Sequence, residues 1–244
     1  MLAVSGSGVS RSSVATRGSA RANPTSQSER ARLHGEIRAD RPLLVVALEI
    51  EAQRLHVHRL PILVTGLGKV NAAASLAVAL AGARPSLVVN LGTAGALRPD
   101  LIGPHEVTHV RQHDLDSAAI ERLTGIWPGG DLTTDAPEGT PPTGLSTGDS
   151  FVADPDHAAA LAEVSSLVDM EGYSVARVAA AFELPVRLIK TVSDGANEDA
   201  VRDWQSTVAA CAAELGNWVH QNLYHDAWAT VGPSTDPELI EPTT

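Results

Sequence analysis

The sequence predicts an α/β protein with a mostly parallel central sheet, and three observations lead to this. Short, continuously apolar segments such as residues 43–48 are typical of strands buried on both faces of a parallel sheet. Alanine-rich or amphipathic segments with helical spacing separate these apolar segments. The 244 residues, 43% of them hydrophobic, are enough for one domain of this class with a complete core. Alternating strands and helices favour helices on both faces of the sheet.

The two ends of the chain differ in composition from its middle. Residues 1–40 are rich in Ser, Arg and Ala, poor in acids before Glu29 and without apolar periodicity, so we expect a disordered extension. The same composition also fits an organelle transit peptide or an overextended start site. Residues 225–244 contain prolines and acidic residues and predict a loose tail. The folded domain is therefore predicted at residues 41–224.

The elements of this domain are expected in a regular order along the chain. Strands are predicted at residues 43–48, 61–65, 86–91, 105–110 and 186–192. Helices are predicted at residues 70–82 and 155–164, from Glu171 onward, and at about 199–223. Residues 124–148 are rich in Gly, Pro and Thr and predict a long loop.

Charge, cysteine content and hydropathy exclude several classes of protein. The net charge is −11 with 18 Lys and Arg and no basic stripe, which argues against a nucleic-acid partner. One cysteine, Cys211, excludes an internal disulfide and fits the reducing cytoplasm. No apolar run approaches the roughly 20 residues that span a bilayer, so no membrane partner is expected. The histidine pairs have no third ligand in a recognised pattern, so we predict no metal.

The turn at residues 66–69, Gly-Leu-Gly-Lys, has the composition of a phosphate-binding loop but not its pattern. Leu63 stands where a P-loop has its first glycine, and Val70 stands where it has Ser or Thr. Asn71 stands at the third glycine of the dinucleotide fingerprint. The sequence therefore predicts a tight strand-to-helix turn and no nucleotide cofactor.

Polar residues directly follow several of the predicted strands. Glu51, the 66–69 turn, the 92–95 turn and Asp194 all lie just beyond a strand end. Ligands of parallel sheets bind beyond the carboxyl ends of the strands, so these residues are expected to converge on one edge. Glu171 lies at a predicted helix start, where the helix dipole favours an anion, and a capped core helix is the alternative explanation for it.

Three carboxylates, Glu51, Glu171 and Asp194, suit the cleavage of a glycosidic bond. One carboxylate can activate water while a second protonates the leaving group. A third can accept hydrogen bonds from ribose hydroxyls. A single acid is more often a surface group or a helix cap, so the prediction rests on the joint placement of all three.

Six short motifs follow one another along the chain. They are Ala47-Leu48-Glu49-Ile50-Glu51, Thr65-Gly66-Leu67-Gly68-Lys69-Val70-Asn71-Ala72-Ala73, Asn90-Leu91-Gly92-Thr93-Ala94-Gly95, Thr147-Gly148-Asp149-Ser150-Phe151, Val168-Asp169-Met170-Glu171 and Val192-Ser193-Asp194. In this order they resemble the motifs of 5′-methylthioadenosine/S-adenosylhomocysteine nucleosidases, which belong to the purine nucleoside phosphorylase superfamily. The resemblance extends from about residue 43 to about residue 219. The resemblance implies a three-layer α/β/α fold with a partly closed sheet, a homodimer, a small-molecule nucleoside substrate and no cofactor.

The resemblance also implies a role for individual residues. Glu51 matches the base that activates water, and Asp194 matches the acid that protonates the purine. Glu171 matches the ligand of the ribose hydroxyls. The other implied substrate contacts are Met170 against the sugar, Phe151 stacked on the base, Val152 reading the purine edge through its backbone, Thr93 near the water, Ser193 holding Asp194, and Gly68 in its turn.

The predicted reaction is hydrolysis of the N-glycosidic bond of a purine nucleoside, an adenosine with a 5′ substituent, with release of adenine. Phosphorylases of the superfamily commonly place Arg just before the Gly-Thr-x-Gly turn, where this chain has Asn90. Lys190 stands where the nucleosidases usually carry Arg, and only about a dozen residues separate Glu51 from Gly66. A phosphorylase and a nucleoside-binding protein without catalysis are the alternatives.

Overall fold

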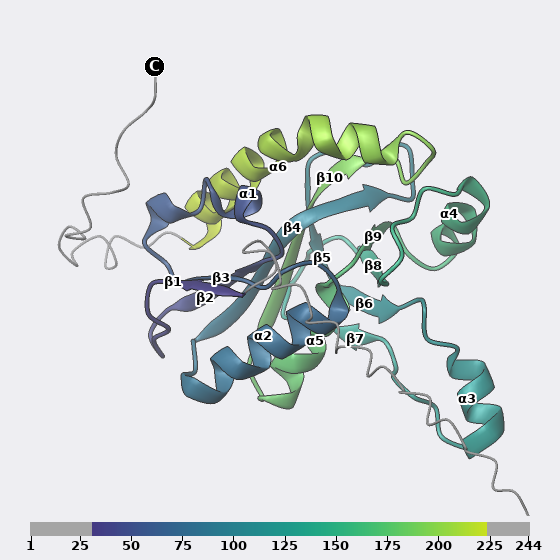
Figure 1. Ribbon diagram of the computed structural model, residues 1–244, viewed down its shortest axis with the longest axis horizontal. Helices are drawn as coiled ribbons and strands as arrows, with labels where there is room; N and C mark the ends of the chain where they lie inside the picture. Colours follow the sequence, from purple (N-terminus) through teal and green to yellow (C-terminus); the bar gives the residue numbers. More distant parts are fainter. Residues whose placement is uncertain (1–30, 224–244) are drawn as a thin grey trace, which may run out of the picture.

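The computed structural model describes residues 31–223, and within them ten strands form one mixed sheet (Figure 1). The strands are β1 Arg32–His34, β2 Pro42–Val46, β3 Ile62–Val64, β4 Leu87–Ala96, β5 Pro104–Val107, β6 His109–Gln112, β7 Leu132–Thr133, β8 Gly144–Thr147, β9 Leu167–Asp169 and β10 Val186–Asp194. The helices are α1 Glu49–Ala52, the 3-10 turn η2 His56–His58, α2 Lys69–Gly82, α3 Ser117–Thr124, α4 Pro155–Ala162, α5 Gly172–Ala181 and α6 Ala200–Leu223.

The sheet is organised around the long strand β4 and is partly closed. β4 pairs in parallel with β2 and β10, and its last two residues pair antiparallel with β9. β9 continues the sheet through β8 to β6. On the other side β10 pairs with β5, which leads into β6 through Thr108. The strands β4, β9, β8, β6, β5 and β10 thus form a ring, which confirms the predicted partly closed sheet.

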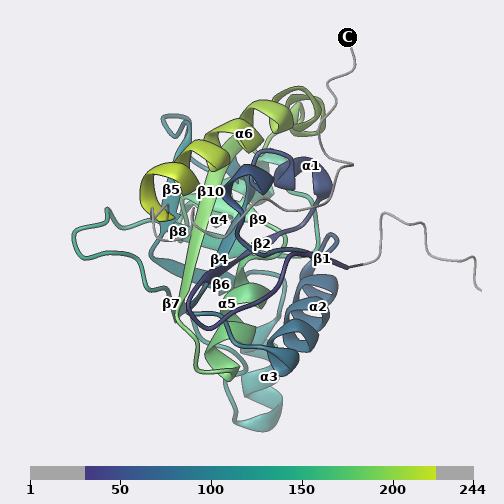
Figure 2. The ribbon, with the colours of Figure 1, turned by 90° about the vertical axis from the view of Figure 1, so that its left-hand side faces the viewer.

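Helices cover both faces of the sheet, so the fold has three layers (Figures 1 and 2). On one face Leu76 of α2 and Val175 of α5 pack with β-strand residues into the larger apolar cluster. On the other face Ala52 of α1 and Leu215 of α6 pack into a second cluster. The predicted α/β class with helices on both faces is confirmed.

Two predictions about local structure are wrong. Residues 1–40 were expected to lack structure, but β1 at Arg32–His34 pairs antiparallel with β3. Residues 124–148 were expected to form a long loop, but β8 lies inside that range and is completely buried. The strand β8 was not predicted because it contains the polar residues Ser146 and Thr147. Their hydroxyl groups form hydrogen bonds inside the protein, with the side chains of Ser165 and Asp169 respectively.

The predicted strand at residues 105–110 is two strands, β5 and β6, on either side of Thr108. The Thr108 backbone N–H and hydroxyl both donate to the carbonyl oxygen of Thr143, and this breaks the strand. The expectations for residues 1–30 and 225–244 lie outside the described residues. Among the described helices, none has the length and apolar character needed to cross a membrane.

Candidate active site

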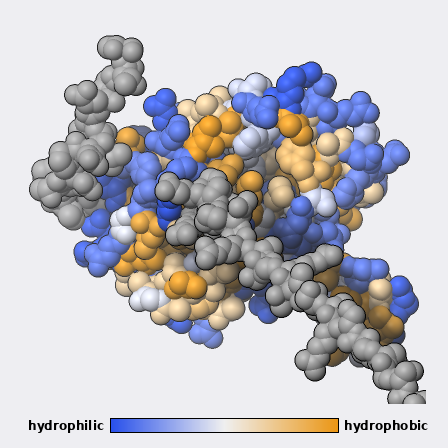
Figure 3. All heavy atoms as spheres, in the orientation of Figure 1, coloured by the Kyte–Doolittle hydropathy of each residue, from blue (hydrophilic) through white to orange (hydrophobic). Residues whose placement is uncertain are grey.

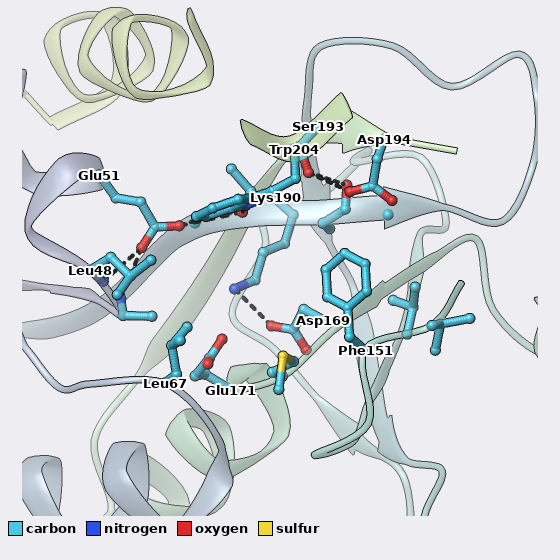
Figure 4. A pocket seen from close by; sticks show the side chains of 18 of the residues that line it. Leu48, Glu51, Leu67, Phe151, Asp169, Glu171, Lys190, Ser193, Asp194 and Trp204 are labelled. Carbon is cyan, nitrogen blue, oxygen red and sulfur yellow. Dashed lines mark hydrogen bonds and ion pairs between the residues drawn. The ribbon is translucent and has the colours of Figure 1, made fainter. Parts of the chain in front are cut away.

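A cavity of about 280 Å³ lies at the carboxyl ends of β4 and β10. Its lining comes from segments that are far apart in the sequence: α1, the end of β4, the loop after β8, the turn between β9 and α5, the end of β10, and α6 (Figure 4). All the predicted site residues except Gly68 belong to the lining, namely Glu51, Thr93, Phe151, Val152, Met170, Glu171, Ser193 and Asp194. The expected convergence on one sheet edge is therefore observed.

Glu51 is buried at the inner end of the cavity and is held by backbone groups. It lies on α1, the short helix that follows β2, and is only 3% exposed. Its Oε2 accepts hydrogen bonds from the N–H groups of Ala47 (3.1 Å) and Leu48 (3.0 Å). Its Oε1 accepts from the N–H of Thr93 (3.1 Å). Burial raises the pKa of Glu51, while these N–H groups and the charge of Lys190 oppose the rise.

Glu171 precedes α5 and is tied to the turn before α2. The N–H of Gly68 donates to Glu171 Oε1 at 2.7 Å, so Gly68 contributes to the site through this carboxylate and not through the lining. Burial, and after it the negative charge of Asp169, raise the pKa of Glu171 to about 8. The capped-helix alternative does not describe Glu171, because its side chain faces the cavity and no side-chain cap hydrogen bond joins it to α5.

Asp169 and Lys190 form a buried ion pair in the floor of the cavity (Figure 4). Lys190 Nζ lies 2.8 Å from Asp169 Oδ2, and the two side chains are 2% and 1% exposed. Asp169 also accepts from the Thr147 hydroxyl (2.5 Å) and from the N–H of Gly172 (2.8 Å). Glu171 occupies the N-cap position of α5, but the side chain that accepts the first N–H of the helix is that of Asp169.

Asp194 lies at the end of β10, where it is held by its neighbours. The Ser193 hydroxyl donates to Asp194 Oδ2 at 2.8 Å, and the N–H of Ala196 donates to Oδ1 at 3.0 Å. Burial raises the pKa of Asp194, while these two hydrogen bonds oppose the rise. The predicted contact between Ser193 and Asp194 is present.

The segment that carries Phe151 and the turn before α2 are linked by a cluster of charges that lies next to the lining residues Leu67 and Ser150 in the sequence but outside the lining itself. Lys69 Nζ forms an ion pair with Asp114, and Asp149 Oδ2 lies 3.7 Å from the same nitrogen. Asp149 Oδ1 accepts from the N–H of Lys69 at 2.8 Å. The N–H of Asp149 donates in turn to Asp114 at 2.8 Å. This cluster joins the segment that carries Phe151 to the segment that carries Gly68.

Sequence reasoning did not select Trp204, which lines the cavity from α6. Its indole N–H donates to Thr93 Oγ1 at 3.0 Å. In the sequence Val201, Trp204 and Val208 have helical spacing, which predicts a core-facing helix and gives no sign of a site. The spacing therefore places Trp204 on the inner face of α6 but does not reveal its partner.

Comparison with known proteins places these features in a family. The sequence pattern described as the phosphorylase superfamily matches residues 24–125 and 145–220. The 5′-methylthioadenosine/S-adenosylhomocysteine nucleosidases of Bacillus anthracis and of Bacillus cereus strain AH187 are each 31% identical over 196 residues. Each alignment covers 72% of this chain and 85% of the relative.

Solved structures with the same fold include two enzymes of Helicobacter pylori. A mutant of its 5′-methylthioadenosine nucleosidase, with 5′-methylthioadenosine in the active site, superposes with a TM-score of 0.65 at 22% identity. That superposition covers 75% of this chain and 98% of the other. The futalosine hydrolase superposes with a TM-score of 0.64 at 21% identity, covering 74% of this chain and 96% of the other.

Proposed function

The chain belongs to the phosphorylase superfamily, and from this premise we propose that it is a nucleosidase that hydrolyses the N-glycosidic bond of a purine nucleoside. The observation that carries the proposal is the arrangement of Glu51, Glu171 and Asp194 around one cavity. Hydrolysis of such a bond needs a base for water and an acid for the leaving group. The cavity contains one carboxyl group for the base, one for the acid and a third that can bind the sugar.

Glu51 is the proposed base. The backbone N–H groups that hold both of its oxygens favour the ionised form and fix the carboxylate in place. It takes a proton from water as the water oxygen bonds to the anomeric carbon. The carbon–nitrogen bond breaks in the same reaction, and its electron pair leaves with the purine.

Asp194 is the proposed acid. Burial raises its pKa, so it keeps its proton to a higher pH than an exposed aspartate does. Protonation of the purine by Asp194 neutralises the charge that the leaving base acquires. Ser193 holds Asp194 Oδ2, which fixes the direction in which the carboxyl faces the cavity.

Glu171 is the proposed ligand of the ribose hydroxyls. A pKa of about 8 leaves this carboxyl mostly protonated at neutral pH, so it offers a donor as well as an acceptor. Met170 is its neighbour in the lining and supplies apolar contact for the sugar. Phe151 lines the cavity and supplies a ring on which the purine stacks, and the Val152 backbone is proposed to read the edge of the purine.

Water, and not phosphate, is the proposed nucleophile. Among the described residues that line the cavity, Lys190 is the one Lys or Arg, and it is paired with Asp169. A phosphate ion would need cationic partners of its own and would be repelled by Glu51. Asn90, at the position where phosphorylases commonly carry Arg, lines the cavity without adding charge.

The proposed substrates are adenosines with a 5′ substituent. The Bacillus relatives are named for 5′-methylthioadenosine and S-adenosylhomocysteine. Leu48, Leu67 and Val201 add apolar side chains to the lining, which suits a thioether better than a free hydroxyl. Futalosine is the second candidate substrate, because the structure of a futalosine hydrolase superposes as well as those of the nucleosidases.

The test is base release by the purified full chain from 5′-methylthioadenosine, S-adenosylhomocysteine, adenosine and futalosine, measured with and without phosphate. We expect release from the 5′-thio nucleosides in phosphate-free buffer, with a free sugar as the second product. A requirement for phosphate and a sugar phosphate product would replace the proposal with a phosphorylase. Saturable binding without release of base from any of the four would leave a binding protein.

The outward face of α2 supports a homodimer. Val70, Ala74, Val78 and Ala81 are exposed on this face, and α2 carries no charged side chain after Lys69 (Figure 3). Apolar helix faces of this kind are typical of protein–protein contacts. The whole chain has a net charge of −11, but two copies that pack through this face of α2 would bring no acidic side chains of the helix together. Sedimentation should show a dimer that Val78→Glu dissociates and Ile102→Glu, on an exposed loop, does not.

The remaining partner and location proposals rest on composition. The net charge of −11 supports the absence of a nucleic-acid partner, and no membrane partner is proposed. The single cysteine, Cys211, is a buried free thiol whose pKa burial raises to about 11. An unreactive thiol of this kind suits the proposed cytoplasmic location.

A further inference from the structure

Trp204 and Glu51 both contact Thr93, the residue near the end of β4. The indole N–H of Trp204 donates to Thr93 Oγ1 at 3.0 Å. The backbone N–H of Thr93 donates to Glu51 Oε1 at 3.1 Å, and Thr93 Oγ1 lies 3.5 Å from that same oxygen. One side of the proposed base is therefore connected to α6 through the Thr93 hydroxyl group.

The chemistry of these groups fixes the direction of the chain of hydrogen bonds. An indole N–H is only a donor, whereas a hydroxyl has one proton to give and two lone pairs to offer. Trp204 therefore occupies one lone pair of Thr93 Oγ1 and cannot receive its proton. The Thr93 proton then has Glu51 Oε1 as its acceptor within the protein.

We propose that Trp204 is a positioning residue for the base, because its N–H commits the Thr93 hydroxyl to donate toward Glu51 Oε1 and the water bound there. This rests on the proposed function, since it concerns how the hydrolytic base is held. The 3.5 Å separation is long for a direct O–H···O bond, so a water can take the Thr93 proton while giving one of its own to Oε1. The water's other lone pair is then free to attack the anomeric carbon.

A fixed donor beside Oε1 also favours the ionised form of Glu51, against the effect of burial. Three other ionisable groups interact electrostatically with Glu51: Lys190 in β10, Glu171 before α5, and Cys211 in α6. Replacing Trp204 by Phe leaves all three in place and keeps an aromatic ring in the lining. A change in the titration of Glu51 in that variant therefore reports on the Thr93 hydroxyl.

The experiment compares Trp204→Phe with the wild type over the acid limb of the pH profile of kcat/KM for 5′-methylthioadenosine. We expect the midpoint of the acid limb to shift to a higher pH by about 0.5–1 unit, because the Glu51 carboxylate loses a hydrogen-bond donor that stabilises its charge. kcat should fall about tenfold while KM changes less than about twofold, because orientation of the water and not binding is affected. Trp218→Phe is the matched control, since Trp218 lies on the same helix but packs on Arg187 outside the cavity.

Variants of Thr93 separate positioning from mere packing. Thr93→Val should move the limb as Trp204→Phe does, and Thr93→Ser, which keeps the hydroxyl, should not. Trp204→Phe should add nothing in the Thr93→Val background, because the group through which it acts is gone. Additive effects, or an acid limb that does not move in Trp204→Phe, would overturn the inference.

A second readout does not depend on turnover. The Glu51 carboxyl resonance of the full chain, isotope-labelled at glutamate and assigned by its loss in Glu51→Gln, should titrate at higher pH in Trp204→Phe than in the wild type. An unchanged titration in an active enzyme refutes the role of Trp204 and leaves the proposed function standing. A shifted titration in a protein that releases no base from any nucleoside refutes the proposed function and supports the positioning by Trp204.

Discussion

The buried ion pair between Asp169 and Lys190 predicts a large loss of stability when one partner is neutralised. In Asp169→Asn the shape of the side chain is kept, but Lys190 Nζ, on a side chain that is 2% exposed, loses the carboxylate 2.8 Å away. A buried charge without its partner costs about 3–5 kcal/mol. For a chain of this length, that loss corresponds to a fall in Tm of roughly 6–20 °C. The total free energy of unfolding of an ordinary domain is about 5–15 kcal/mol, so the expected loss is a large share of it.

The assay is urea unfolding followed by circular dichroism, with Asp169→Asn, Lys190→Met and the double variant Asp169→Asn/Lys190→Met measured side by side. Each single variant should be strongly destabilised, whereas the double variant should recover much of the loss, because neither charge of the pair remains and the amide oxygen can still accept a hydrogen bond from the N–H of Gly172. Arg38→Met is the control, because Arg38 pairs with Asp40 at the exposed surface, where water and salt screen the pair and it adds little to stability. A loss in Asp169→Asn no larger than that of the control would refute the reasoning.

Three further predictions concern the acid, the sugar ligand and the cluster of charges around Lys69. Asp194→Asn should lower kcat by about 10²–10⁴-fold without loss of nucleoside binding, as seen in single-turnover and equilibrium-binding measurements; near-normal turnover would remove Asp194 from the mechanism. Glu171 has a folded-state pKa of about 8 against an ordinary 4.5, so the stability it contributes is fully present at low pH and is lost as the pH rises from about 4.5 to 8. Stability measured by unfolding across that range should fall less in Glu171→Gln than in the wild type, where Glu51 and Asp194 also contribute to the fall; equal falls in the two proteins would contradict the raised pKa of Glu171. Lys69→Met should raise KM more than it lowers kcat, because Asp114 and Asp149 lose the ammonium that lies between them and only the backbone hydrogen bond from Lys69 to Asp149 still ties the segment that carries Phe151 to α2; steady-state kinetics would disprove this if kcat alone fell.

The parts of the fold that follow strong apolar patterns were predictable from the sequence. The strands β2, β3 and β10 and the helices α2, α5 and α6 lie close to their predicted positions, whereas β4 continues to Ala96 through the turn predicted at residues 92–95. Their buried faces consist of Val, Leu, Ile and Ala, and the spacing of these residues is enough to identify the elements. The buried strand β8 shows where this reasoning stops, because Ser146 and Thr147 look like loop residues until their buried hydrogen-bond partners are known.

The positions of two of the three carboxylates, Glu51 and Asp194, were predictable for a different reason. Glu51 lies just beyond β2 and Asp194 is the last residue of β10, and because both strands run parallel to β4, their ends meet at one edge. Contacts that depend on side-chain direction could not be predicted in this way. The pairing of Lys190 with Asp169, and of Trp204 with Thr93, joins residues that are 21 and 111 positions apart, and no spacing in the sequence indicates it.

The most direct test of the account is the origin of the oxygen on the released sugar. 5′-Methylthioadenosine is incubated with the protein in phosphate-free buffer made with water labelled with heavy oxygen, and adenine and sugar are measured by mass spectrometry. Glu51→Gln is compared with Glu49→Gln, because Glu49 lies on the same helix but faces His34 at the surface. We predict one heavy oxygen in the sugar, with adenine release reduced about 10²–10⁴-fold by Glu51→Gln and unaffected by Glu49→Gln. Equal rates of adenine release in the two variants would contradict the claim that Glu51 activates water.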